Sequence, residues 1–267
     1  MSDLSIQELQ QIAESYQKYL VPAMFKECSE QLVSHAGITP GQRVLDIACG
    51  TGILARTAAK QVGENGSVVG LDMNPGMLSV ARQLAPDLEW QQGIAEELPF
   101  EDNSFDITFC QFSLMFFQDK QTAIREMLRI LTSQGRLYIA VFNSLEHIPA
   151  YQQLLSIYAD FVDEDKVHFL SSPFQLGDIQ ELNSLLLESG LESPRITSGE
   201  LNAVWPDVRS LVLADVEGWF PLAGIELGDD QVEEVIKQTK SELGEYINGD
   251  GSIAFTMPYH LISHKHY

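Results

Sequence analysis

The chain has 267 residues, of which 45% are hydrophobic, enough for one large domain or for a domain with a lid. Its 38 acidic and 16 basic residues give a formal net charge of −22, which would repel a polyanion and excludes nucleic acid as an expected partner. The three cysteines, Cys28, Cys49 and Cys110, show no paired spacing. We therefore expect neither a disulfide framework nor a bound metal.

The N-terminal stretch "MSDLSIQELQQ" is polar and differs from a secretion leader, and no apolar run approaches membrane-spanning length. These features predict a cytoplasmic protein without a membrane span. We expect a monomer or a homodimer.

Two helices are expected first, over Ser5–Glu14 and Tyr16–His35, the second interrupted near Pro22. From Gln42 onward, short β-rich runs alternate with helical ones, which is typical of a doubly wound, mostly parallel sheet with crossover helices. The predicted strands are Arg43–Ile47, Ser67–Leu71, Leu88–Gln92, Phe105–Cys110 and Arg136–Phe142. The predicted helices between them are Ile53–Val62, Gly76–Leu84 and Lys120–Leu131, the last closed by the turn "SQG" at Ser133–Gly135.

Beyond Asn143 the alternation becomes irregular. Helices are predicted at Ala150–Asp163, Asp178–Ser189, Pro206–Trp219 and Asp229–Tyr246, with a strand at Arg195–Val204. The closing "DGSIAFTMPYHLISHKH" alternates apolar residues after an "NGDG" turn and predicts a last strand, antiparallel, at the sheet edge. We thus expect one domain: an N-terminal helical cover (1–41), a cofactor-binding core (42–143), a sheet completion with helical lid insertions (144–250) and a final edge strand (251–267).

The stretch "VLDIACGTGILA" at 44–55 predicts a ligand-binding loop, because open α/β sheets bind ligands beyond the carboxyl ends of their strands. Gly50 and Gly52 permit a tight turn and a close backbone approach. The loop satisfies G-x-G-x-x-A, with Asp72 placed for a ribose diol, so an NAD(P)-dependent oxidoreductase stays open. Asp46 favours a different ligand, because a carboxylate at this position would oppose a diphosphate but suits an amino group and a sulfonium. Asp46 could instead tie the loop by accepting its N–H groups.

Four ordered segments carry a family resemblance: "VLDIACGTG", "VVGLDMNPGMLSVAR", "GIAEELPFEDNSFDITFCQFSLMFF" and "AIREMLRILTSQGRLYIAVF". With them, the chain resembles the class I S-adenosylmethionine-dependent methyltransferases, nearest to the group that includes quinone-biosynthesis methyltransferases. The resemblance implies a seven-stranded Rossmann-like sheet with an antiparallel last strand, S-adenosylmethionine as cofactor, S-adenosylhomocysteine as product and a small-molecule acceptor. A binding protein for the same cofactor without turnover is the second alternative.

The resemblance also implies cofactor contacts. The methionine end is lined by Asp46, Ala48, Gly50 and Gly52, and the ribose is bound by Asp72. The remaining contacts are Met73 beside the adenine, Ala95 and Glu96 at its edge, and Gln111 facing the cofactor. Tyr16 is a candidate flap over the methionine end, with an ordinary buried helix aromatic as its alternative. Two positions depart from the family pattern. Ala48 replaces a common glycine, a mild change unless its φ is positive. Ile94 replaces an aspartate and cannot accept a hydrogen bond from the adenine amino group.

Methyl transfer is an in-line displacement, so the protein mainly aligns the acceptor and excludes water. If a base is needed, His147 is the first candidate, since it follows the fifth strand of the core; a solvated position at a helix entrance is its alternative. Tyr151, His168 and His260 are further candidates. Apolar walls for a small hydrophobic or aromatic acceptor would come from Phe169, Phe174, Trp205, Trp219 and Phe220 and from the stretch "FCQFSLMFF", although core packing is the commoner use of such residues.

Overall fold

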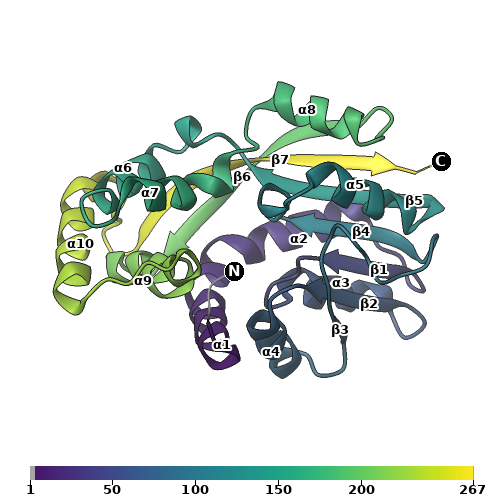
Figure 1. Cartoon of the computed structure of the whole chain (residues 1–267), viewed down its shortest axis with the longest axis horizontal. Helices are drawn as coiled ribbons and strands as arrows, with labels where there is room; N and C mark the ends of the chain where they lie inside the picture. Colours follow the sequence, from purple (N-terminus) through teal and green to yellow (C-terminus); the bar gives the residue numbers. More distant parts are fainter. Residues whose placement is uncertain (1–3, 267) are drawn as a thin grey trace.

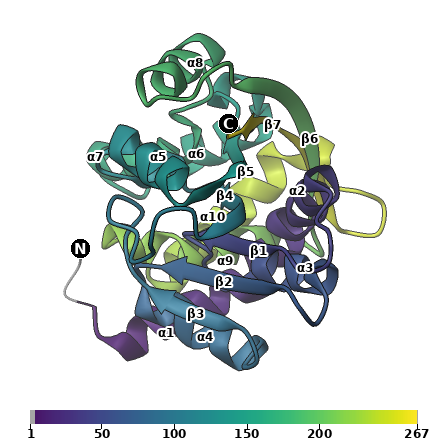
Figure 2. The ribbon, with the colours of Figure 1, turned by 90° about the vertical axis from the view of Figure 1, so that its right-hand side faces the viewer.

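A seven-stranded sheet forms the centre of the molecule in the computed structural model, which describes residues 4–266. The strand order is β3-β2-β1-β4-β5-β7-β6, with β7 antiparallel to both of its neighbours and the pairs from β3 to β5 parallel. Figure 2 shows β5, β4, β1, β2 and β3 one below the other. The predicted fold class is confirmed. The strands are β1 (Arg43–Ile47), β2 (Ser67–Asp72), β3 (Glu89–Gln92), β4 (Phe105–Gln111), β5 (Leu131–Phe142), β6 (Arg195–Trp205) and β7 (Ile253–Lys265).

Three helices of the first half, those that begin after Ser5, Asn74 and Asp119, have polar side-chain caps that the local sequence supplies. Ser5 and Glu8 form a capping box at the start of the first helix, and Asn74, followed by Pro75, caps the fourth. These helices are α1 (Ile6–Ser15), α2 (Lys26–Ala36), α3 (Ile53–Val62), α4 (Pro75–Leu84) and α5 (Lys120–Arg129). The N-terminal cover thus lies beside the sheet, and α1 packs on α4 at Gly76, where a Cβ would come within 2.3 Å of the Leu9 backbone.

The predicted interruption near Pro22 takes the form of a π-helix, η1 (Tyr16–Phe25), which continues α1 into α2. Proline has no N–H and its ring clashes with the carbonyl four residues earlier, so a normal α-helical turn cannot pass through Pro22 unchanged. The wider π turn keeps the segment helical, and such turns are frequent at functional sites.

The lid consists of two insertions near the carboxyl edge of the sheet. Six residue pairs of β6 and β7, from Glu200–Pro258 to Trp205–Ile253, extend beyond the last pair of β5 with β7, Phe142–Tyr259. Figure 1 shows this two-stranded ribbon running from the sheet into the lid helices. These helices are α6 (Pro149–Tyr158) and α7 (Glu164–Ser171) before β6, and α9 (Val208–Gly218) and α10 (Asp229–Glu242) after it. The remaining helix of the first insertion, α8 (Ile179–Glu188), lies against α5 beside the sheet and not among the lid helices (Figure 1).

Two sequence predictions are wrong. The last strand is not the edge strand: β7 lies between β5 and β6, and β6 forms the edge. β7 is buried along most of its length and so needs two neighbours, whereas the first half of β6 is largely open to solvent. The turn "SQG" closes no helix, because α5 ends at Arg129 and Ser133–Gly135 belongs to β5.

Residues 1–3 of the predicted N-terminal cover and Tyr267 of the predicted last segment lie outside the described residues. Across residues 4–266, no helix combines the length and the apolar character that crossing a bilayer requires.

Candidate active site

The loop after β1 takes a left-handed backbone at three of its positions: φ is +53° at Ala48, +55° at Gly50 and +81° at Gly52. Two features require glycine at position 52: its positive φ, and the Trp90 ring, which would lie 2.2 Å from a Cβ there. Ala48 therefore meets the condition, a positive φ, under which alanine is not a mild change at this position. A left-handed alanine is strained by roughly 1–2 kcal/mol.

Two buried carboxylates hold this loop. Asp46 Oδ2 accepts a hydrogen bond from the Ala55 N–H over 2.9 Å, at the start of α3. Asp72 Oδ2 accepts from the Gly50 N–H over 2.8 Å, and its Oδ1 accepts from the Asn74 N–H over 2.8 Å. The alternative role of Asp46, tying the loop through its N–H groups, is therefore present in the structure.

The same carboxylates lack a positive partner. Asp46 is 1% exposed and Asp72 is 8% exposed, and among residues 4–266 neither forms an ion pair with a basic side chain. Burial raises the pKa of Asp46 to about 8, helped by the nearby charge of Asp72, and burial also raises the pKa of Asp72. A buried carboxylate is stabilised by a nearby positive charge. The two carboxylates therefore fit a cationic ligand, such as a sulfonium with an amino group, and would repel a diphosphate.

Tyr16 lies over the loop. A Cβ at Gly50 would be 3.6 Å from the Tyr16 hydroxyl oxygen, and the Tyr16 ring stacks on Phe25 with centroids 5.2 Å apart. Burial and the charge of Asp72 raise the pKa of the Tyr16 hydroxyl, which therefore stays protonated. The next residue, Gln17, accepts a hydrogen bond from Thr51 Oγ1 over 2.7 Å. Sequence reasoning missed Gln17, whose only signal was its position beside Tyr16.

The expected adenine contacts lie at the ends of β2 and β3. The side chains of Met73 and Ile94 are apolar yet each is 42% exposed, whereas Ala95 is buried. The Glu96 carboxylate accepts a hydrogen bond from the Gln118 N–H over 2.9 Å and so fixes the segment before α5.

Gln111 ends β4 and joins the sheet to the N-terminal cover. Its Oε1 accepts from Ser29 Oγ over 2.9 Å, and its Nε2 donates to the Phe25 carbonyl over 3.1 Å. The amide of Gln111 is therefore engaged with the cover.

His147 lies at the surface, in the short helix η3 (Leu145–His147). Its side chain is 56% exposed, and Nδ1 is 3.8 Å from Glu146 Oε1. It lines a pocket of about 270 Å³ with residues such as Glu200 and Tyr246, and none of the loop residues 46–52 borders that pocket. This position matches the solvated alternative, and the structure does not bring His147 to the loop.

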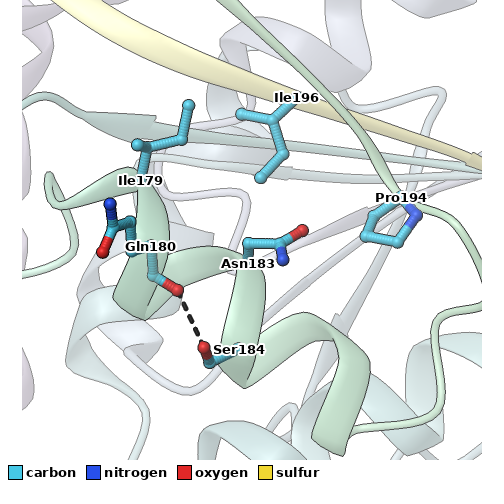
Figure 3. A pocket seen from close by; sticks show the side chains of 6 residues that line it. All are labelled: Ile179, Gln180, Asn183, Ser184, Pro194 and Ile196. Atoms are coloured by element: carbon cyan, nitrogen blue, oxygen red, sulfur yellow. Dashed lines mark hydrogen bonds between the residues drawn. The ribbon is translucent and has the colours of Figure 1, made fainter.

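A larger pocket of about 440 Å³ lies between α8 and the start of β6 (Figure 3). Ser184 Oγ in its wall donates to the Gln180 carbonyl, an ordinary bond within α8. None of the predicted cofactor residues lines this pocket, so volume alone does not locate the active site.

The lid aromatics separate into two groups. Phe174, Trp205 and Phe220 are at most 6% exposed and belong to the core. Phe169 and Trp219 are only partly buried, and Trp219 contacts Phe116, whose side chain is 43% exposed. Only the second group is available to an acceptor.

One further buried acid escaped sequence reasoning. Asp215 of α9 is 3% exposed, and its carboxylate accepts hydrogen bonds from the hydroxyls of Tyr151 at 3.0 Å and Tyr158 at 2.8 Å. Burial raises the pKa of Asp215 to about 6, against the lowering effect of the two hydroxyls. The sequence feature that could have identified Asp215 is its place as the single acid within the apolar run "LVLADV". Tyr151, a candidate base, thus donates a hydrogen bond to Asp215, and burial raises the pKa of its hydroxyl, so it stays protonated.

The sheet order, the glycine loop and its unpaired carboxylates define a Rossmann-like methyltransferase, and comparison with known proteins agrees. The family described as a methyltransferase domain matches residues 45–139. A ubiquinone/menaquinone biosynthesis C-methyltransferase, UbiE, of Ectopseudomonas mendocina is 34% identical over 177 residues, which cover 59% of this chain and 68% of that protein.

Solved structures show the same fold. The YcgJ protein of Bacillus subtilis gives a TM-score of 0.60 at 21% identity, covering 90% of this chain and 98% of the other. Phosphoethanolamine N-methyltransferase 2 of Haemonchus contortus, solved in complex with S-adenosylmethionine, gives 0.56 at 19% identity, covering 90% of this chain and 52% of the other. The chain belongs to the class I S-adenosylmethionine-dependent methyltransferases, in the UbiE-like family. It is a methyltransferase that uses S-adenosylmethionine and acts on a small molecule, and the oxidoreductase and non-catalytic alternatives find no support.

Proposed function

We propose that this enzyme methylates a small aromatic acceptor and that the two loop carboxylates, Asp46 and Asp72, hold the cofactor's cationic and ribose ends. The observation that carries the proposal is their burial without a basic partner at the carboxyl edge of the sheet. The aromatic acceptor is supported by the partly exposed rings at the lid. Since the UbiE relative is named a C-methyltransferase of quinone biosynthesis, we infer a hydroxylated ring as the acceptor.

The further cofactor contacts follow from the positions described above. The proposed set comprises Tyr16, Ala48, Gly50 and Gly52 at the methionine end, Met73, Ile94, Ala95 and Glu96 around the adenine, and Gln111 as the residue that fixes the cover. The exposed apolar side chains of Met73 and Ile94 offer a planar base an apolar contact. Packing would then replace the hydrogen bond that an acid at position 94 would accept.

S-adenosylmethionine, when bound, would supply an activated methyl group to the acceptor. The protein contributes alignment and exclusion of water. Tyr16 and Gln17 close the loop from the N-terminal side, and Gln111 fixes that cover to β4. Because His147 is at the surface, we propose that the acceptor's proton leaves to water without a dedicated base.

We also propose a cytoplasmic location. All three cysteines are free and buried, which suits a reducing compartment.

Calorimetry tests the cofactor assignment. S-adenosylmethionine and S-adenosylhomocysteine should bind the wild type, and NADH should not. Asp46→Asn should weaken S-adenosylmethionine about tenfold and S-adenosylhomocysteine less, because only the former carries the sulfonium charge. Asp230→Asn, the same change on the exposed first turn of α10, should alter neither. The proposal would be disproved if the wild type bound NADH and not S-adenosylmethionine. It would also be disproved if Asp46→Asn and Asp230→Asn bound S-adenosylmethionine with equal affinity.

A further inference from the structure

The guanidinium of Arg56 lies against the cofactor loop without an acid beside it. Arg56 is near the start of α3, and its Nε donates to the Gly52 carbonyl over 3.2 Å. The side chain is partly buried, and across residues 4–266 it forms no ion pair with an aspartate or glutamate. Burial lowers the pKa of Arg56, the direction expected for a cation that has no carboxylate partner. A partly buried charge of this kind is stabilised by an anion from outside the chain.

Gln17 of η1 orients this guanidinium. Its Oε1 accepts a long hydrogen bond from Arg56 Nη2, over 3.4 Å, and a shorter one from Thr51 Oγ1, over 2.7 Å. Thr51 is 1% exposed and therefore fixed within the loop. Gln17 also follows Tyr16, which lies over Gly50. One amide thus joins the N-terminal cover, the cofactor loop and Arg56.

The guanidinium keeps hydrogen-bond donors for a ligand. Nε and Nη2 are engaged by Gly52 and Gln17, whereas Nη1 has no partner within the described part of the chain. A planar guanidinium binds a carboxylate through parallel N–H groups. Asp46 and Asp72 would repel a carboxylate, so Arg56 is the group beside the loop that attracts one. The site therefore offers separate places to the positive and negative ends of a zwitterion.

We propose that Arg56 binds the carboxylate of the cofactor's amino-acid end and that Gln17 positions the guanidinium for it. The inference rests on the proposed function and deepens it, because Asp46 there holds the positive end and Arg56 now holds the negative end. The loop selects a complete amino-acid group through this pair of opposite charges. Arg56 is a binding residue, and Gln17 acts through Arg56.

Calorimetry tests Arg56 with two ligands that differ only in the carboxylate: S-adenosylhomocysteine and its decarboxylated analogue, which keeps the amino group. Arg56→Gln should weaken S-adenosylhomocysteine about tenfold and leave the analogue nearly unchanged. Arg56→Lys keeps the charge without the planar fork and should weaken S-adenosylhomocysteine about threefold. Lys60→Gln removes the same charge from an exposed position one turn further along α3 and should alter neither affinity.

The positioning role of Gln17 is tested through the ratio of the two affinities. Gln17→Leu should lower the preference for S-adenosylhomocysteine over the analogue about threefold. Added to Arg56→Gln, it should lower the preference no further, because Gln17 then has no guanidinium to position. If Gln17→Leu weakened both ligands equally and kept the ratio, its role would be structural only.

The same titrations separate the possible failures. If the wild type binds neither ligand, the proposed function fails and this inference fails with it. If the wild type binds S-adenosylhomocysteine but Arg56→Gln weakens both ligands equally, or neither, only the inference is overturned. An equal loss in Lys60→Gln would also overturn it, since attraction by any nearby cation would then suffice.

Discussion

The backbone N–H of Gly50 donates to the carboxylate of Asp72 over 2.8 Å, so the residue that ends β2 fixes the loop that follows β1. Because β1 and β2 are parallel neighbours, their carboxyl ends meet at one edge of the sheet. Asp46 lies near the carboxyl end of β1, and the charge of Asp72 adds to the effect of burial in raising the pKa of Asp46.

Cofactor binding should release a proton. The pKa of Asp46 is about 8 in the unliganded fold, so most of this carboxyl is protonated at pH 7. A cationic ligand favours the ionised form and lowers that pKa, so the affinity gained from Asp46 increases as pH rises toward 8. Calorimetry at pH 7 in two buffers of different ionisation enthalpy measures the proton release. Asp46→Asn should release fewer protons on binding, because the contribution of Asp46 is removed. The expectation would be contradicted if wild type and variant released the same number of protons.

Asp215 should make stability depend on pH. Its pKa of about 6 in the fold exceeds its ordinary value of 3.8, so the fold holds the proton more tightly than the unfolded chain. The contribution of Asp215 to the free energy of unfolding is complete below pH 4 and is lost as the pH rises through 6. The loss is about 3 kcal/mol at most. The free energy of unfolding in urea between pH 4 and 7 should fall more steeply for the wild type than for Asp215→Asn. Asp230→Asn serves as control, and parallel curves for wild type and Asp215→Asn would refute this.

Ala48→Gly should stabilise the protein. The φ of +53° strains an alanine but not a glycine, and the relief exceeds the extra entropy that glycine gives the unfolded chain. We expect a gain of roughly 0.5–1 kcal/mol in the free energy of unfolding. Ala59→Gly in α3 is the matched control and should lose about 1 kcal/mol. Equal losses in the two variants would show that Ala48 is unstrained.

Gly52→Ala should destabilise through two effects. The left-handed backbone costs about 1–2 kcal/mol, and overlap of the new Cβ with the Trp90 ring adds about 1–3 kcal/mol. Gly251→Ala separates the effects, because Gly251 has φ +89° but nothing within 4 Å of its Cβ position. Urea unfolding should show a clearly larger loss for Gly52→Ala. Similar losses of unfolding free energy in the two variants would mean that the Trp90 side chain moves to accommodate the new methyl group.

The local pattern of the sequence determined the sheet core and its ligand loop. Strands such as Arg43–Ile47 and the helix Ile53–Val62 were predicted with the bounds that the structure shows, because alternation, caps and glycine turns are encoded by neighbouring residues. The cofactor class followed from Asp46, the glycines and the ordered family segments.

Only the tertiary structure decided the features that depend on distant partners. The place of β7 beside β5, the hydrogen bonds from Tyr151 and Tyr158 to Asp215, and the ring contact between Phe116 and Trp219 join residues dozens of positions apart. The positive φ of Ala48 likewise depends on how the loop is held by β2. Such contacts leave no periodic signal in the sequence, because their energy comes from burial and pairing that exist only after the sheet has assembled.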